Sequence, residues 1–110
     1  MELFQACEVF SSLSQETRLK VFKLIIEYGA DGAIPSHIAE ELEIPDNTLS
    51  FHLSHMSKAG LVTSKKNGRS LTYFANADLV NKLIAFLREN CCEREKKQKP
   101  GSIKCKERKC

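Results

Sequence analysis

The middle of this 110-residue chain constrains its fold more than any other part. At the helical period, Leu49, Leu53 and Met56 fall on one apolar stripe. Asp46 stands where a helix N-cap would accept a free backbone N–H, and Gly60 stands where a helix end needs a left-handed residue. The sequence therefore predicts an amphipathic helix with one buried face.

The other face of this predicted helix is rich in hydrogen-bonding groups and contains no carboxylate. Its polar residues are Asn47, Thr48, Ser50, His52, Ser54, His55 and Lys58. Most amphipathic helices only separate core from solvent. A polar face without acids, preceded by a short helix and followed by a basic hairpin, instead favours contact with the major groove of DNA.

The hairpin follows from a change of the apolar period to 2, which predicts strands over residues 61–66 and 69–74. Asn67-Gly68 between them is a strong signal for a two-residue turn with positive φ at both positions. The basic residues near its tip are Lys65, Lys66 and Arg69. Such a tip also keeps an edge strand from pairing, but after a polar-faced helix it is typical of a DNA-binding wing.

Helical patterns predict four further helices. The first covers residues 2–12, the second is capped by Ser14 and ends near Tyr28, the third covers 35–43, and the last covers 78–92. In the second helix we expect the buried side chains to be Leu19, Phe22, Leu24, Ile25 and Ile26. We therefore expect a mainly α (α+β) winged helix-turn-helix with about five helices and a two-stranded β-hairpin wing.

The charge divides the chain into two parts. Residues 91–110 hold eight Lys/Arg and three Glu, which gives 8 − 3 = +5, whereas residues 1–90 hold nine Lys/Arg and eleven acids, which gives 9 − 11 = −2. Global charge alone would not suggest DNA binding; the local charge of the hairpin does. We expect a DNA-binding and dimerisation domain over 1–92 and a flexible, basic, cysteine-containing tail over 93–110.

The first and last helices have wider apolar faces than a small monomer needs. Leu3, Cys7 and Phe10 form one row of the first helix. The apolar residues of the last helix are Leu79, Val80, Leu83, Ile84, Phe86 and Leu87. We expect a homodimer through these two helices; the alternative is that both only cap the core. Cys7 is expected to pack in its apolar row.

The chain has no run of about 18 apolar residues and no basic segment followed by an apolar one at its start. We therefore expect a cytoplasmic protein without a membrane span, whose thiols stay reduced. Five cysteines in such a protein point to metal binding or redox chemistry rather than to a disulfide framework.

The chain resembles the ArsR/SmtB family of metalloid- and metal-sensing repressors. The matching stretches are residues 13–19 (the signature around the second helix), 50–53 and 59–62 (the recognition helix and its exit), and 67–69 with Tyr73 (the wing). The resemblance covers about residues 8–90 and implies a homodimer that sits on an imperfect palindrome of operator DNA until an inducer binds. No cofactor is expected to be needed for DNA binding.

Within this framework each polar residue receives an expected role. Asn47, Ser50 and His52 would approach base edges. The residues expected to hold phosphates are Thr48, Ser54, Lys65, Lys66 and Arg69.

Two common inducer sites of the family are missing. Many arsenite sensors carry a cysteine pair before the recognition helix, but residues 34–39 contain no cysteine. Zinc sensors use Asp and His along the last helix, where Asp78 is present without a histidine. The chain looks like the subgroup with a vicinal cysteine pair near the C-terminus, here Cys91 and Cys92.

A trivalent arsenic or antimony centre prefers three soft thiolates. Cys91 and Cys92 can supply two if the last helical turn unwinds, since neighbouring side chains on a helix point about 100° apart. Cys105 is the nearer candidate for the third, and Cys110 is the alternative. We expect a repressor that As(III) or Sb(III) releases from its operator.

Two other interpretations remain open, and a third is unfavoured. A redox-switched repressor would pair Cys91 or Cys92 with Cys105 or Cys110. Zinc or copper(I) could replace the metalloid. A small thiol enzyme is not expected, because the chain has no Cys-x-x-Cys, no phosphate-binding glycine loop and no cysteine at a predicted helix N-terminus.

Overall fold

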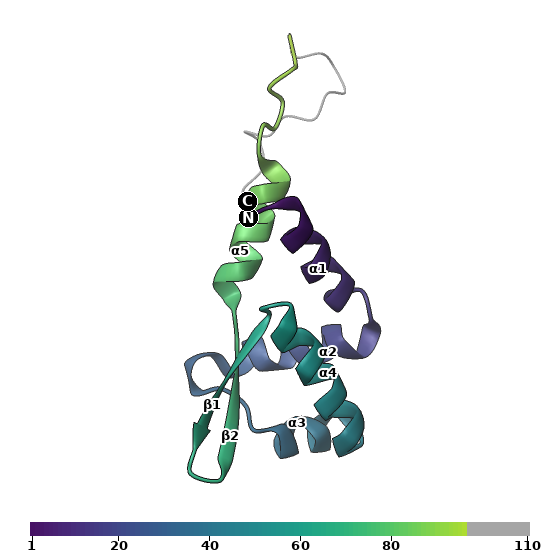
Figure 1. The fold of residues 1–110 in the computed structure, drawn as a ribbon, viewed down its shortest axis with the longest axis vertical. Helices are drawn as coiled ribbons and strands as arrows, with labels where there is room; N and C mark the ends of the chain where they lie inside the picture. Colours follow the sequence, from purple (N-terminus) through teal and green to yellow (C-terminus); the bar gives the residue numbers. More distant parts are fainter. Residues whose placement is uncertain (97–110) are drawn as a thin grey trace.

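The computed structural model describes residues 1–96, and in them it has the predicted winged helix-turn-helix architecture (Figure 1). The elements are α1 (Leu3–Leu13), α2 (Glu16–Tyr28), the 3-10 helix η1 (Gly29–Asp31), α3 (Pro35–Leu42), α4 (Asp46–Lys58), β1 (Val62–Asn67), β2 (Ser70–Ala75) and α5 (Ala77–Arg88). Among these residues no helix is long and apolar enough to cross a membrane.

The core is formed by buried side chains of α2, α3 and α4, to which α1, the start of β1 and α5 add further residues, and α1 packs against both α2 and α4. On α2 the buried side chains are Val21, Phe22, Leu24 and Ile25. Leu19 and Ile26, which we expected to be buried, are 44% and 42% exposed. Leu19 and Ile26 stand seven residues apart, so they lie on one stripe of α2 beside the buried face. Neither α1 nor α3 covers this stripe.

Both predicted N-caps are wrong by one residue. The α2 cap is Gln15, whose side chain accepts the Arg18 N–H at 2.8 Å, while the Ser14 hydroxyl donates to the Ser11 carbonyl. Asp46 is already the first residue of α4, and Pro45 occupies the cap position without a side-chain hydrogen bond.

The end of α4 is the one predicted at Gly60, which has φ +84°. The Leu61 N–H donates to the Met56 carbonyl at 2.9 Å, and the Gly60 N–H donates to the Ser57 carbonyl at 3.1 Å. This pair of bonds is the Schellman motif, in which an apolar contact usually accompanies the reversal. Met56 and Leu61 are both fully buried, so the exit from α4 and the start of the wing are firmly fixed.

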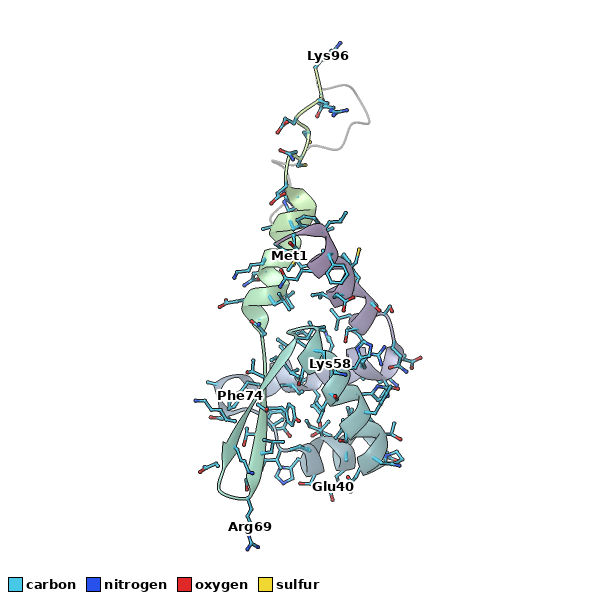
Figure 2. The ribbon with its side chains drawn as sticks, viewed as in Figure 1. Met1, Glu40, Lys58, Arg69, Phe74 and Lys96 are labelled. Atoms are coloured by element: carbon cyan, nitrogen blue, oxygen red, sulfur yellow. The ribbon has the colours of Figure 1, made fainter. Side chains whose placement is uncertain are left out.

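The wing hairpin turns one residue later than the sequence suggests. Asn67 pairs with Ser70 in the antiparallel ladder, so the two turn residues are Gly68 and Arg69. Of these only Gly68 has positive φ, at +66°. A two-residue turn with its glycine first has the II′ pattern instead of the I′ pattern that Asn67-Gly68 would form. Arg69 therefore lies at the extreme tip (Figure 2).

The base of the wing is joined to the body by a single-residue bridge. Ala33 and Tyr73 exchange two backbone hydrogen bonds of 2.8 Å. Next to the bridge, Gly32 has φ +72°, and a Cβ there would stand 2.6 Å from side-chain carbons of Phe74 and Thr72. Only glycine lets the chain approach the wing this closely.

The last helix rises away from the body beside α1, at the end of the molecule opposite the wing tip (Figure 1). It ends at Arg88, not at Cys92 as predicted, because Glu89 has extended geometry with ψ 136°. Asn90 and Cys92 then adopt positive φ of 61° and 65°. The cysteine pair accordingly lies in turns just beyond the helix.

Candidate nucleic-acid interface

Helix α4 is oriented by its apolar stripe. Leu49, Leu53 and Met56 are at most 2% exposed, which confirms the predicted buried face. This leaves the opposite, acid-free face in solvent. Its exposed polar residues are Asn47, Thr48, Ser50, Ser54, Ser57 and Lys58.

His52, expected to approach base edges, instead points into the protein and is only 7% exposed. Its position three residues after Leu49 places it beside the apolar stripe. The Arg18 guanidinium Nη1 lies 3.3 Å from His52 Nδ1. Because a guanidinium can only donate, Nδ1 accepts and the imidazole is neutral with its proton on Nε2. Burial lowers the pKa of His52, and the nearby charges of Arg18 and His55 lower it further.

Arg18 and two histidines form a polar cluster that joins α1, α2 and α4. The Arg18 Nε donates to the Ser12 carbonyl at 2.7 Å. The fully buried Ser12 hydroxyl lies 3.1 Å from His55 Nδ1. Two consecutive inner turns of α4, at His52 and His55, are thus tied to α1 and α2. Sequence reasoning missed this cluster, since it joins residues 34 and 43 positions apart.

Phe51 is the second feature of α4 that sequence reasoning missed. It is 65% exposed although it lies on the polar face of α4. Its ring meets the His52 ring edge to face, with centroids 5.6 Å apart and planes at 65°. The signal in the sequence was a large apolar residue outside the apolar stripe.

The basic residues of the wing are all exposed, as predicted. Lys65 pairs with Thr72 and Lys66 pairs with Leu71. Since successive side chains of a strand point to opposite faces, the two lysines lie on opposite faces of the hairpin.

The two neighbouring cysteines bring their sulfur atoms together. Cys91 Sγ and Cys92 Sγ are 3.4 Å apart, which is a contact and not an S–S bond. Cys91 itself is disulfide-bonded. Cys105 and Cys110 lie outside the described residues. Within residues 1–96 no three Cys, His, Asp or Glu side chains gather around a potential metal position. Cys7 is exposed, against the expectation that it packs inside.

The exposure of Cys7 belongs to a larger apolar surface on α1 and α5. In the single chain Leu3 and Phe4 are 69% and 70% exposed on α1. On α5, Ile84 and Leu87 are 45% and 59% exposed. The first and last helices thus leave much of their apolar area uncovered, as the width of their apolar faces predicted.

Known proteins are similar to this chain in sequence and in fold. A family model described as a helix-turn-helix domain matches residues 13–65. An uncharacterised HTH-type transcriptional regulator of Methanocaldococcus jannaschii is 34% identical over 90 residues, which are 81% of this chain and 99% of that protein. A protein of Halobacterium salinarum, provisionally named as an arsenical resistance operon repressor, is 32% identical over 65 residues, 59% of this chain and 50% of its own.

Among solved structures, an ArsR-like transcriptional regulator from Rhodococcus sp. RHA1 superposes with a TM-score of 0.71 at 30% identity, covering 81% of each chain. Both the Methanocaldococcus and the Rhodococcus proteins are named as transcriptional regulators. Together with the winged helix-turn-helix seen here, they show that this chain belongs to the ArsR/SmtB family of transcriptional regulators.

Proposed function

We propose that this regulator is a metalloid-responsive repressor, a homodimer that leaves its operator when As(III) or Sb(III) binds thiolates near its C-terminus. The observation that carries the DNA-binding part is the exposed, acid-free face of α4 beside a wing with a basic tip. Asn47 and Ser50 approach base edges in the major groove, whereas Thr48, Ser54 and the wing hold phosphates. His52 acts as an internal support.

The dimer is supported by the apolar surface of the two terminal helices. Leu3, Phe4, Ile84 and Leu87 are all more than 40% exposed, and each contributes about 1.5–3 kcal/mol when fully buried. In a twofold dimer each of these side chains is buried in both protomers, so its contribution counts twice. It would also present two copies of α4 about one turn of DNA apart, as palindromic operators require.

The inducer part is supported by the cysteine pair. An ion bonded to two thiolates at about 2.3 Å, a usual metal–thiolate length, needs sulfur atoms less than about 4.6 Å apart. The Cys91 and Cys92 sulfurs, 3.4 Å apart, meet this condition once the disulfide at Cys91 has been reduced. Both residues lie in turns beyond α5, so helical geometry no longer directs their side chains away from each other. Cys105 is the proposed third ligand, with Cys110 as its alternative. The arsenical-resistance name of the Halobacterium relative also supports this inducer.

Asn76 supplies a mechanical link between the cysteine end and the recognition helix. Its side-chain N–H donates to the Gly60 carbonyl at 3.0 Å, at the exit of α4. Its side-chain oxygen accepts the Leu79 N–H at 3.2 Å, in the first turn of α5. A shift of α5 upon inducer binding would therefore be transmitted to α4. A coupling of about 1–3 kcal/mol is the usual range for such regulation.

A second candidate function, a redox-switched repressor, is favoured by one observation, the disulfide at Cys91. Its test is mass mapping after mild peroxide beside a DNA-release assay without metalloid. Release that accompanies a new disulfide at Cys91 or Cys92 would favour this candidate. Release by arsenite under reducing conditions would favour the metalloid sensor.

The DNA-binding part is tested by the salt dependence of binding. Arg69→Ala should weaken binding to all sequences alike and lower the slope of log K against log salt by about one. Lys82→Ala is the matched control, since it removes one exposed positive charge from α5, far from the wing. Its slope should equal that of the unmodified protein. A change of base preference without a change of slope in Arg69→Ala would contradict the wing assignment.

A further inference from the structure

Phe51 occupies the middle of the face that α4 presents to solvent. At about 100° per residue it lies almost opposite the stripe of Leu49, Leu53 and Met56, and its side chain is 65% exposed. The exposed residues around it on this helix are polar: Asn47, Ser50, Ser54 and Lys58. Within residues 1–96, the ring of His52 is the aromatic partner of this large apolar side chain at the centre of a polar surface.

The contact with His52 gives the Phe51 ring a defined direction. The two rings meet edge to face at 5.6 Å, and His52 is itself fixed by Arg18. An aromatic side chain has only two rotatable bonds, so little conformational entropy remains to be lost upon binding. Phe51 is therefore a pre-oriented apolar projection.

The surroundings of Phe51 indicate what it contacts. Hydrogen-bonding side chains and Lys58 flank it on α4, and no carboxylate stands between residues 47 and 58. This environment complements a polyanion better than an apolar protein surface. In the major groove of DNA the distinctive apolar group is the 5-methyl group of thymine, against which phenylalanine can pack.

We infer that Phe51 is a specificity-determining residue that reads the 5-methyl group of one thymine in each half-site. This inference rests on the proposed DNA-binding function and specifies which base, and which group of that base, the helix recognises. Burying one methyl group is worth about 0.8 kcal/mol, or about fourfold in affinity. Removal of the methyl from both half-sites of a palindrome should therefore cost about 15-fold.

The test uses the full-length, reduced protein and removes single methyl groups from DNA. Duplexes that the protein binds are first selected from random sequence. Each thymine of the selected duplex is then replaced singly by deoxyuridine, which lacks only the 5-methyl group, and Kd is measured by fluorescence anisotropy. The proteins compared are the unmodified chain, Phe51→Ala, Phe51→Leu and the control Phe4→Ser, which alters another exposed phenylalanine on α1.

The unmodified chain should lose about fourfold at one thymine per half-site and little elsewhere. Phe51→Ala should bind the thymine and deoxyuridine duplexes equally, and Phe51→Leu should retain part of the difference. Phe4→Ser should keep the full ratio even if its overall affinity falls. A selected duplex for which every deoxyuridine substitution is neutral, or a ratio that survives in Phe51→Ala, overturns the inference and leaves DNA binding intact. Failure to enrich any duplex overturns the proposed function and the inference with it.

Discussion

At the residue scale, Phe51 and His52 show how one step along a helix separates two roles. Phe51 is 65% exposed on the outer face of α4, whereas His52 is 7% exposed and accepts a hydrogen bond from Arg18. A rotation of about 100° per residue explains the difference. The inner residue positions the helix, and the outer residue is available to a partner.

The neutral state of His52 makes stability depend on pH. Its pKa is lowered in the folded chain by burial and by Arg18 and His55, so below about pH 6.5 the unfolded chain binds more protons at this site. The free energy of unfolding should therefore fall as pH decreases from 7.5 to 5.5. His52→Asn, which retains an acceptor for Arg18, should show a weaker fall in urea titrations.

His37→Asn is the control for this pH effect, because it removes an exposed histidine on α3. It should retain the full pH dependence of the unmodified protein. A His52→Asn variant whose pH dependence equals that of His37→Asn would contradict the role given to His52.

Gly32 and Gly29 allow a second residue-scale comparison. Both have positive φ, with ψ of −133° at Gly29 and 177° at Gly32, outside the left-handed helical region, so alanine at either costs about 1–3 kcal/mol in backbone strain. At Gly29 nothing lies within 4 Å of the added Cβ, whereas at Gly32 it would meet Phe74 and Thr72 at 2.6 Å. Gly32→Ala should therefore lose about 1–3 kcal/mol more than Gly29→Ala in urea unfolding. An equal loss of unfolding free energy in the two variants would show that Phe74 and Thr72 can move away from the added Cβ at no cost, which contradicts the close packing at the base of the wing.

At the element scale, local patterns predicted more than long-range contacts did. The stripe of α4 and its stop at Gly60 follow from the order of a few adjacent residues, and both predictions are confirmed. The turn at Gly68-Arg69 was missed by one residue because Asn67 suits both a turn and a strand end. The bond between Arg18 and His52 spans 34 residues, and no local pattern predicts it.

The C-terminal end of α5 shows a similar limit. The apolar pattern itself stops at Leu87, and the polar residues after it are compatible with either a helix or a turn. The structure ends the helix at Arg88, which releases Cys91 and Cys92 from helical geometry. The need for such release was predictable from thiolate chemistry, but its position was not.

The junction at Asn76 carries an element-scale prediction. Asn76→Ala removes the N-cap of α5 and the hydrogen bond to Gly60, so it should lower the free energy of unfolding by about 2 kcal/mol. Asn76→Asp keeps the capping oxygen and loses only the donor, so its loss should be smaller. Asn81→Ala, at an exposed position of α5, should change stability by less than about 0.5 kcal/mol. Identical unfolding curves for all three variants would contradict the junction.

At the scale of the whole molecule, the chain places the proposed dimer surface at one end and the proposed DNA-binding face at the other. Figure 1 shows α1 and α5 side by side at the end of the molecule opposite α3 and the wing tip. This separation allows a substitution to be placed on one of the two proposed surfaces without touching the other. It also means that the proposed inducer near the end of α5 would act on DNA binding from a distance.

The dimer is tested by substitution of its apolar surface. Phe4→Ser should weaken the homodimer by about 3 kcal/mol over its two copies, roughly a hundredfold in Kd, as measured by sedimentation equilibrium. Leu71→Ser, at an apolar residue of the wing that is 36% exposed, should leave the dimer unchanged. A monomeric unmodified protein at micromolar concentration would contradict the proposed assembly.

The central claim is that a thiophilic inducer at Cys91 and Cys92 controls DNA binding. The most direct measurement is fluorescence anisotropy of the reduced protein on its own promoter DNA, titrated with arsenite beside the Cys91→Ser/Cys92→Ser double variant. The account predicts that arsenite releases the unmodified protein and leaves the double variant bound. Release of both proteins, or of neither, would contradict the claim.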